Sequence, residues 1–178
     1  PELRKAASYR ALPAAVRKTQ FTPATPLRGS ARLRWQGPGS GALDQYLPKS
    51  GRKALVVSPF LGATFLRPIQ AGYQEVIVIS TQQALDEISD PQVQARLATG
   101  KSRAYVVEPV DSDDQGPVLD LHAKIFVFEN TNERTVFIGS ANGTRNAWHA
   151  GNVEVALQFA PGFSVETFCD KFVWRERV

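Results

Sequence analysis

The sequence predicts an α/β fold, a mixed β-sheet flanked by helices on both faces, and two observations support this prediction. Buried strand-like runs such as Lys53–Ser58 and Glu75–Ser80 alternate with helical segments, as they do where parallel strands are joined by helices. Later strands follow one another closely. Leu121–Phe128 and Thr135–Ile138 are separated only by the turn Glu129–Arg134, which predicts an antiparallel hairpin.

The first 41 residues differ in composition from the rest, being rich in Arg, Lys, Pro, Gly and Ser. Leu3–Lys18 has the character of a basic helix that Pro13 interrupts, and Ala31–Trp35 of a short strand. Two interpretations stay open, a linker or arm packed on the domain, and a basic arm that touches phosphates. We therefore divide the chain into this arm, residues 1–41, and a domain over residues 42–178.

The stretch from Ala42 onward predicts the regular elements of that domain. Strands are expected at Lys53–Ser58, Glu75–Ser80, Arg103–Val107, Val118–Phe128, Thr135–Ile138 and Asn152–Phe159. Helices are expected at Leu43–Leu47, Gly62–Ala71, Thr81 to about Thr99, and Val165–Glu176. Thr81 is the expected N-cap of the third helix, Pro91 its break and Gly100 its stop. Asp111–Pro117 is expected to be a polar loop.

Composition excludes several classes of protein. With 178 residues, 43% hydrophobic and 21% charged, the chain is typical of a soluble globular domain. No apolar run approaches the ~20 residues of a membrane span, and no secretory signal is visible, so we expect a cytoplasmic protein. The single cysteine, Cys169, excludes an internal disulfide and a cysteine-based metal site. The net charge of +4 is compatible with nucleic acid or another anionic partner, and does not identify one.

Chemistry is concentrated in the segment Leu121–Glu154. In a strand, His122 and Lys124 would project from the same face, and the apolar run that follows them makes them unusual packing residues. A Gly139-Ser140-Ala141-Asn142 turn comes next, and Asn152-x-Glu154 follows.

This order of motifs resembles the phospholipase D superfamily, whose signature is His-x-Lys, four residues, an Asp, and then Gly-Ser-x-Asn. Here Glu129 stands at the position of the Asp, which is usually a structural residue. An acidic residue such as Glu154 follows in the bacterial nuclease branch. The resemblance covers roughly Leu43 onward and implies the half-unit fold of that family.

The resemblance also implies roles. His122 would be the nucleophile, attacking phosphorus through Nε2 to form a phosphohistidine, and Glu154 would accept a hydrogen bond from its other ring nitrogen. Lys124 and Asn142 would hold the non-bridging oxygens, and Ser140 and the backbone amides of the turn from Gly139 would add donors that bind the substrate. No metal and no cofactor is expected.

The resemblance further implies a partner, because family members use two histidines from two His-x-Lys motifs. This chain holds one motif, so we expect the second from a homodimer or from the other half of a longer protein. The absence of Met and the start at Pro1 favour a domain cut from a longer chain, with residues 1–41 as the connecting segment. His149 is interpreted as an exposed loop histidine, and becomes the candidate acid only if a monomer is active.

The leading hypothesis is a metal-independent phosphodiesterase, a nuclease that hydrolyses DNA or RNA. The first alternative is a lipid substrate, for which Phe60, Leu61, Phe65 and Leu66 are candidate interface residues, although a buried helix start is the favoured interpretation. The second alternative is a non-catalytic binding or dimerisation half of the same fold, hinted at only by Glu129.

Overall fold

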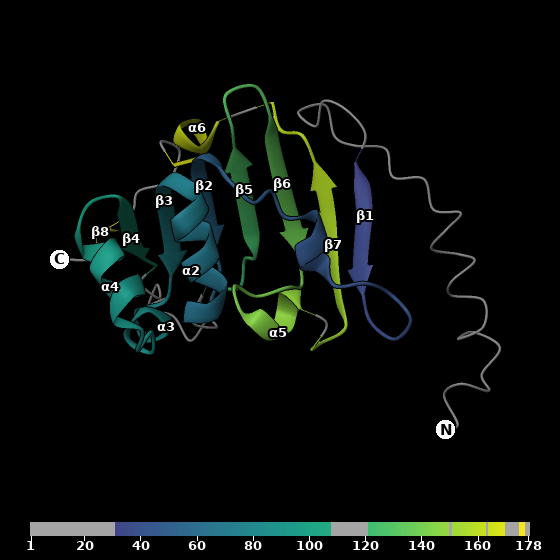
Figure 1. Ribbon diagram of the computed structural model, residues 1–178, viewed down its shortest axis with the longest axis horizontal. Coiled ribbons are helices and arrows are strands. Elements are labelled where there is room, and N and C mark those ends of the chain that lie inside the picture. The colour runs from purple at the N-terminus through teal and green to yellow at the C-terminus, as the bar shows by residue number, and fades with distance from the viewer. Residues whose placement is uncertain (1–30, 108–120, 150, 163, 170–174, 177–178) are drawn as a thin grey trace, which may run out of the picture.

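The protein is built on one eight-stranded sheet in a computed structural model, which describes residues 31–107, 121–149, 151–162, 164–169 and 175–176 (Figure 1). The strands are β1 (Arg32–Gln36), β2 (Gly51–Val57), β3 (Tyr73–Ser80), β4 (Ser102–Val106), β5 (Ile125–Glu129), β6 (Arg134–Gly139), β7 (Glu154–Phe159) and β8 (Arg175–Glu176). Their order across the sheet is β1-β7-β6-β5-β2-β3-β4-β8.

The sheet is mixed, as predicted. β2, β3 and β4 are parallel to one another, because a helical connection returns the chain after β2 and again after β3. β5 runs antiparallel to β2 and to β6, and β6 to β7. The predicted hairpin is therefore confirmed, with Glu129 paired to Arg134 at its turn.

Helices cover both faces of the sheet, which confirms the predicted fold class. They are the 3₁₀-helix η2 (Leu43–Tyr46), α2 (Ala63–Gly72), α3 (Gln82–Asp86), α4 (Pro91–Ala98), α5 (Arg145–Trp148) and α6 (Val165–Cys169). α2 and α5 pack on one face, where Phe65 and Trp148 join the larger hydrophobic core. Val165 of α6 joins a second core on the opposite face.

The helix expected from Thr81 to about Thr99 is divided into α3 and α4, and the predicted break at Pro91 is confirmed. Thr81 caps α3 by accepting from the Ala84 amide at 3.2 Å. Asp90 caps α4 by accepting from the Gln92 and Val93 amides. Gly100 follows α4 with a φ of +79°, a conformation that glycine adopts without a steric penalty.

The prediction of one helix over Val165–Glu176 is wrong at its end. α6 stops at Cys169, and Arg175–Glu176 form β8, which pairs with Tyr105 and Val106 of β4. The apolar spacing that favoured a helix could not show that the edge of β4 offers free backbone groups to a passing strand.

Two further strands differ in their bounds from the predictions. β5 begins at Ile125, so Leu121–Lys124 lead into the strand rather than belong to it, and β7 begins at Glu154 rather than Asn152. Val118–Asp120, the Asp111–Pro117 loop and the segment Leu3–Lys18 lie outside the described residues.

β1 lies inside the segment 1–41 but belongs to the sheet, where it pairs antiparallel with β7. Gln36 at its end is fully buried. Its side-chain amide donates to the Ala147 carbonyl at 2.8 Å and accepts from the Leu43 amide at 2.9 Å. This one side chain therefore fastens β1 to both η2 and α5.

Candidate active site

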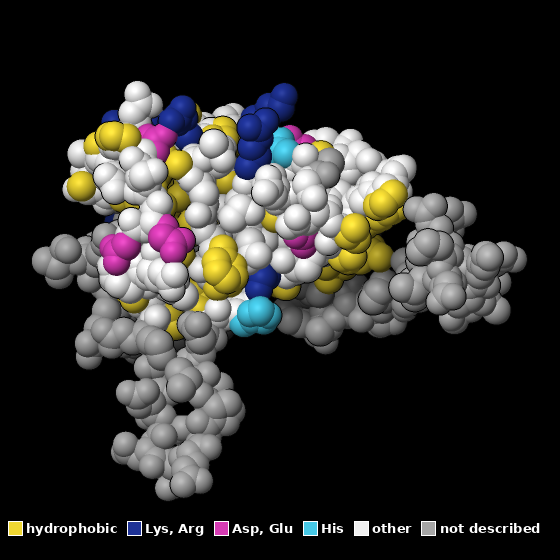
Figure 2. All heavy atoms as spheres, turned by 90° about the horizontal axis from the view of Figure 1, so that it is seen from below, with side chains coloured by type: hydrophobic (Ala, Val, Ile, Leu, Met, Phe, Trp, Pro, Cys, Tyr) yellow, Lys and Arg dark blue, Asp and Glu magenta, His cyan; other side chains and the backbone are white. Residues whose placement is uncertain are grey.

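The motif residues gather at one edge of the sheet. β5, β6 and β7 are neighbours, and β5 and β7 begin where β6 ends, at the lower edge in Figure 1. His122 and Lys124 precede β5, Ser140 and Asn142 follow β6, and Glu154 opens β7. Antiparallel pairing thus brings together three sequence segments that lie up to 32 positions apart. Figure 2 views this edge of the molecule.

His122 and Lys124 lie side by side, as the sequence predicts. The Lys124 ammonium donates to the His122 carbonyl oxygen at 2.8 Å, and lies 3.5 Å from His122 Nδ1. The imidazole is exposed and the lysine is half-buried. An exposed imidazole beside a cation is accessible to an anionic substrate, whereas neither group makes a packing contribution that would explain its position.

Gly139 closes β6 against β7 where no side chain fits. A Cβ atom at this position would overlap the Val155 carbonyl oxygen and lie 2.7 Å from the Ala156 Cα. Its amide donates to the Lys124 carbonyl at 3.3 Å, which ties the end of β6 to the segment that carries His122. The glycine of the Gly-Ser-x-Asn turn is therefore required by the close approach of two strands.

Ser140 and Glu154 form the polar centre of the edge. The Ser140 hydroxyl donates to Glu154 Oε2 and accepts from the Val155 amide at 3.0 Å. Asn152 Nδ2 donates to Glu154 Oε1 at 3.1 Å, and Glu154 is only 6% exposed. Each carboxylate oxygen thus has a side-chain donor, as a buried carboxylate requires.

Asn142 is held by its backbone. Its carbonyl oxygen accepts from Trp148 Nε1 at 2.9 Å and from the Thr144 amide at 2.8 Å. Its side-chain oxygen Oδ1 is the one buried side-chain acceptor without a partner among the residues that the structure describes. An orphaned acceptor costs free energy in a purely structural site, so its presence here is typical of a functional position.

The neighbouring Gly143 is fastened to the end of β2. Its amide donates to Ser58 Oγ at 2.9 Å, and its carbonyl oxygen accepts from the Gly62 amide at 2.9 Å. Sequence reasoning missed Ser58 and Trp148 as supports of this turn. No motif marks either residue, and Ser58 lies 85 positions from the glycine that it binds.

Glu129, at the position of the family Asp, lies at the other end of β5 from His122. It is 2% exposed, accepts from Arg52 Nη2 at 2.8 Å, and accepts from the Val165 amide at 3.2 Å at the start of α6. Burial acts to raise the pKa of Glu129, but the hydrogen bonds and the positive charge of Arg52 outweigh it and hold the pKa below its usual range. Glu129 is therefore a structural residue that joins β5, β2 and α6.

Some expected contacts are not formed. The described partners of the Glu154 carboxylate are Ser140 and Asn152, and His122 is not one of them. The amides of Gly139 and Ser140 bond to Lys124 and Val155, so these donors are occupied inside the turn. His149 Nδ1 lies 3.0 Å from Asp44 Oδ2, and Figure 2 shows the two histidines of the chain well apart.

The lipid-contact candidates separate into two groups. Phe65 and Leu66 are 2% and 0% exposed and pack from α2 into the larger hydrophobic core, as the interpretation of a buried helix start expected. Leu61 packs against the same core, whereas Phe60 is 59% exposed. Over the described parts of the chain, no helix is both long enough and apolar enough to cross a bilayer.

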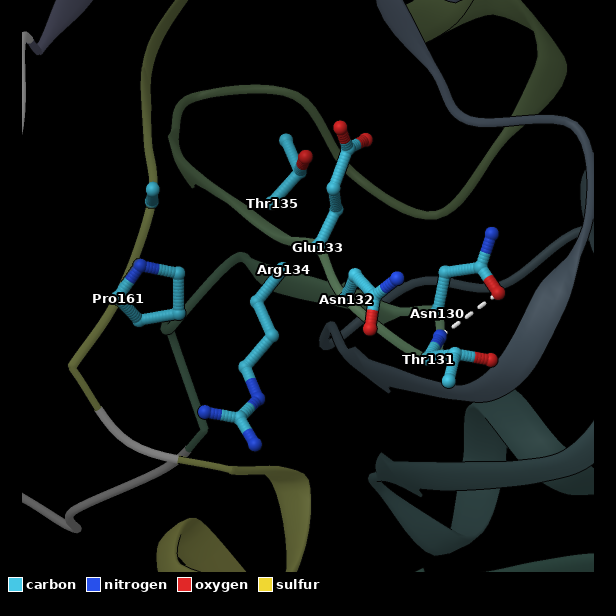
Figure 3. A pocket seen from close by; sticks show the side chains of 8 residues that line it. Asn130, Thr131, Asn132, Glu133, Arg134, Thr135 and Pro161 are labelled. Carbon is cyan, nitrogen blue, oxygen red and sulfur yellow. Dashed lines mark hydrogen bonds between the residues drawn. The ribbon is translucent and has the colours of Figure 1, made fainter.

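The largest hollow found among the described residues lies away from the motif residues. A hollow of about 510 Å³ is lined by the β5–β6 turn, residues 130–135, together with Ala160 and Pro161 (Figure 3). It lies at the opposite end of β5 from His122 and contains none of the motif residues. In the ranges that the structure describes, no three His, Cys, Asp or Glu side chains cluster as metal ligands would. The carboxylates of the Asp111–Pro117 loop, those of Asp111, Asp113 and Asp114, lie outside those ranges.

Comparison with known proteins gives matches at the level of structure. No family model and no curated protein sequence matches the chain. NucT from Helicobacter pylori superposes with a TM-score of 0.52 at 14% identity, covering 80% of this chain and 91% of NucT. Phosphatidylserine synthase from Haemophilus influenzae gives 0.50 at 12% identity, covering 92% of this chain and 43% of that one. Nuc from Salmonella typhimurium, a phospholipase D family member, gives 0.49 at 17% identity, covering 83% and 97%.

The chain has a phospholipase D-like fold. The fold predicted from the motif order is thereby confirmed. In this phospholipase D-like sheet the His-x-Lys, Gly-Ser-x-Asn and Glu segments lie on three adjacent strand ends, which the sequence alone could only suggest.

Proposed function

We propose that the chain is a phosphodiesterase that hydrolyses DNA or RNA through a phosphohistidine on His122, without a metal ion. One observation carries the proposal: an exposed histidine and a lysine lie in contact at a sheet edge that also presents Asn142 and the Ser140–Glu154 pair. This set contains a nucleophile, cationic and amide donors for phosphate oxygens, and a carboxylate to stabilise positive charge.

The first step transfers the phosphoryl group to the protein. The lone pair of His122 Nε2 attacks phosphorus, the bond to the leaving oxygen breaks, and an acid protonates that oxygen. Water then attacks phosphorus and breaks the P–N bond, which restores the imidazole. Lys124 and Asn142 hold the non-bridging oxygens in both steps, where negative charge develops.

Lys124 must change its contacts during this cycle. An ammonium has only protons to donate, so its approach to His122 Nδ1 favours the tautomer with the proton on Nε2. Attack through Nε2 requires the other tautomer. A bound phosphate draws the ammonium to its oxygens and releases Nδ1 to carry the proton.

Glu154 acts in the proposal through Ser140 and Asn152. These two side chains fix the position of the carboxylate beside the strand ends, where its charge stabilises the imidazolium character of His122 during attack. We assign Ser140 to positioning and Gly139 to the close approach of β6 and β7, in place of direct substrate binding.

The acid for the leaving oxygen comes from a second copy of the site. His149 is paired with Asp44 and lies away from His122, so it does not complete this site. We propose that another chain, or the other half of a longer protein, presents its own His-x-Lys motif across a twofold axis.

The test is cleavage of labelled single- and double-stranded DNA and RNA in EDTA. Wild type is compared with His122→Ala, and with His149→Ala as the matched control because it removes the other histidine of the chain. Cleavage that survives EDTA and His149→Ala, and falls by at least ~10³-fold in His122→Ala, supports the proposal. Full activity of His122→Ala, or complete loss in EDTA, contradicts it.

The shared site has a separate test. Mixing wild type with an excess of inactive His122→Ala protein leaves each mixed pair with one histidine instead of two, so activity per wild-type chain should fall, and the mass of the active species is measured alongside. An active species with the mass of one chain contradicts the shared site.

A further inference from the structure

Phe60 is exposed to solvent, unlike the phenylalanines of the hydrophobic core. Its side chain is 59% exposed, whereas Phe65, Phe126 and Phe137 are each 2% exposed or less. An exposed aromatic ring costs free energy of hydration and contributes nothing to the core. The position of Phe60 relative to the candidate site indicates whether the ring could bind a substrate.

Phe60 lies just beyond the end of β2, at the edge of the sheet where β5 begins. Val57 is the last residue of β2 and pairs with Ile125, the first residue of β5. Phe60 and His122 each lie three residues beyond this pair, at the same edge of the sheet. In Figure 2, which faces this edge, hydrophobic side chains are exposed close to a histidine and a basic side chain.

The backbone around Phe60 is fixed to the Gly-Ser-x-Asn turn. Ser58 Oγ donates to the Phe60 carbonyl at 2.8 Å and accepts from the Gly143 amide at 2.9 Å. Leu61 forms a bridge with Gly143, the residue that follows Asn142. The ring is therefore presented from a backbone that is fastened on both sides to the phosphate-binding turn.

The surroundings of the ring favour a nucleobase over a lipid. Pro59 before it is buried and Leu61 after it packs on the core, so neither neighbour in the sequence joins Phe60 in a contiguous apolar surface. Insertion into a membrane needs such a surface. A single exposed ring beside a phosphate site is instead suited to a nucleotide whose phosphate binds at His122 and whose base stacks on Phe60.

We propose that Phe60 is a substrate-binding residue that stacks on an unpaired base next to the scissile phosphate and so selects single-stranded nucleic acid. The inference rests on the proposed phosphodiesterase function and names its substrate class. Bases in a duplex are already stacked on their neighbours, whereas a single strand can offer a free face to the ring without the cost of unpairing. Stacking on phenylalanine accepts every base, so the selection is for strandedness and not for sequence.

The experiment separates stacking from structure by removing the base. The kcat/KM of full-length wild type, Phe60→Ala, Phe60→Leu and Phe60→Trp is measured on a single-stranded oligothymidylate and on an abasic strand of the same length. Leu33→Ala is the matched control, because Leu33 is an exposed apolar residue of β1 that pairs with Leu157, away from the strand ends that carry the site.

Phe60→Ala and Phe60→Leu should lower kcat/KM on oligothymidylate by roughly 5- to 150-fold, the equivalent of ~1–3 kcal/mol per stacked base. Phe60→Trp should retain the wild-type value, and every variant should match wild type on the abasic strand within about twofold. Equal losses on both strands, or no loss on either, overturn the inference.

A binding measurement keeps the two proposals distinct. In the His122→Ala background, fluorescence anisotropy gives the affinity for the same two strands without cleavage. Suppose that Phe60→Ala weakens binding to oligothymidylate but not to the abasic strand, and that the wild-type protein cleaves no nucleic acid. This result would support Phe60 as a stacking residue and overturn the proposed activity. If the wild-type protein cleaves nucleic acid but Phe60→Ala weakens binding to both strands equally or to neither, the proposed activity is supported and the stacking role of Phe60 is overturned. Phe60-dependent binding to phosphatidylglycerol vesicles, with none to oligothymidylate, would overturn the inference in favour of a lipid.

Discussion

The Ser140 hydroxyl donates to the Glu154 carboxylate while accepting from the Val155 amide, so one side chain joins the end of β6 to the start of β7 and to the buried charge of the site. Ser140→Ala removes a donor from a carboxylate that is 6% exposed. We expect it to lower the free energy of unfolding by about 1–3 kcal/mol in chemical denaturation and to reduce kcat.

A double-mutant cycle with Glu154→Gln distinguishes positioning from packing. The neutral amide retains an acceptor for Ser140 but loses the charge, so both variants should lose activity and the double variant should lose little more. Independent, additive losses in kcat would show that Ser140 does not act through Glu154.

Gly139→Ala should separate β6 from β7 at the site. The added methyl group overlaps the Val155 carbonyl and cannot be accommodated without backbone movement, so we expect a loss of ~1–3 kcal/mol in the free energy of unfolding. Gly62→Ala is the control, since the nearest atom to its Cβ would be 3.6 Å away. Equal melting temperatures for both variants would contradict this account of the glycine.

Trp148→Phe should affect Asn142 more than the core. The indole is fully buried among Phe65, Phe126 and Phe137, and a phenyl ring retains most of that contact. It loses the 2.9 Å hydrogen bond to the Asn142 carbonyl. We expect about 1–2 kcal/mol of destabilisation and a lower kcat, measured by denaturation and cleavage. A cavity effect alone would lower stability without changing kcat once the protein is folded.

Glu129 should make stability depend on acid pH. Its pKa in the folded protein lies below the 4.5 of an ordinary Glu, because the Arg52 hydrogen bond, the Val165 amide and nearby positive charge outweigh burial. The contribution is complete above pH ~4.5 and is lost as pH falls through the folded-state pKa. Glu129→Gln should therefore cost on the order of 1 kcal/mol at pH 7, with a smaller difference from wild type at pH 3.

Exposed Glu133, in the same hairpin turn, provides the control for that measurement. Glu133→Gln should have the wild-type free energy of unfolding at pH 7, because an exposed side chain contributes little to stability. A Glu129→Gln difference that stays constant from pH 7 to pH 3 would show that ionisation of this carboxyl is not involved.

The sequence predicted the strands that border the candidate site, because their apolar runs are long and their turns are marked. It also predicted that His122 and Lys124 lie together, since a spacing of two in an extended chain leaves few alternatives. The partners of Glu154 could not be predicted, because donors from Ser140 and Asn152 reach it only once β6 and β7 pair. Ser58 and β8 were missed for the same reason: tertiary contacts between distant segments determine both.

Edge strand β1 has a consequence for how the domain folds. The Arg34–Gln158 hydrogen bond joins residues 124 positions apart, whereas the β5–β6 hairpin that supports the site closes across a short turn. Loop-closure entropy favours the hairpin first and the addition of β1 late. Arg34→Ala should therefore accelerate unfolding and leave the refolding rate nearly unchanged in stopped-flow measurements. The strand ends that carry the candidate site would then assemble before the sheet is complete, and β1 would mainly slow the unfolding of a site that has already formed.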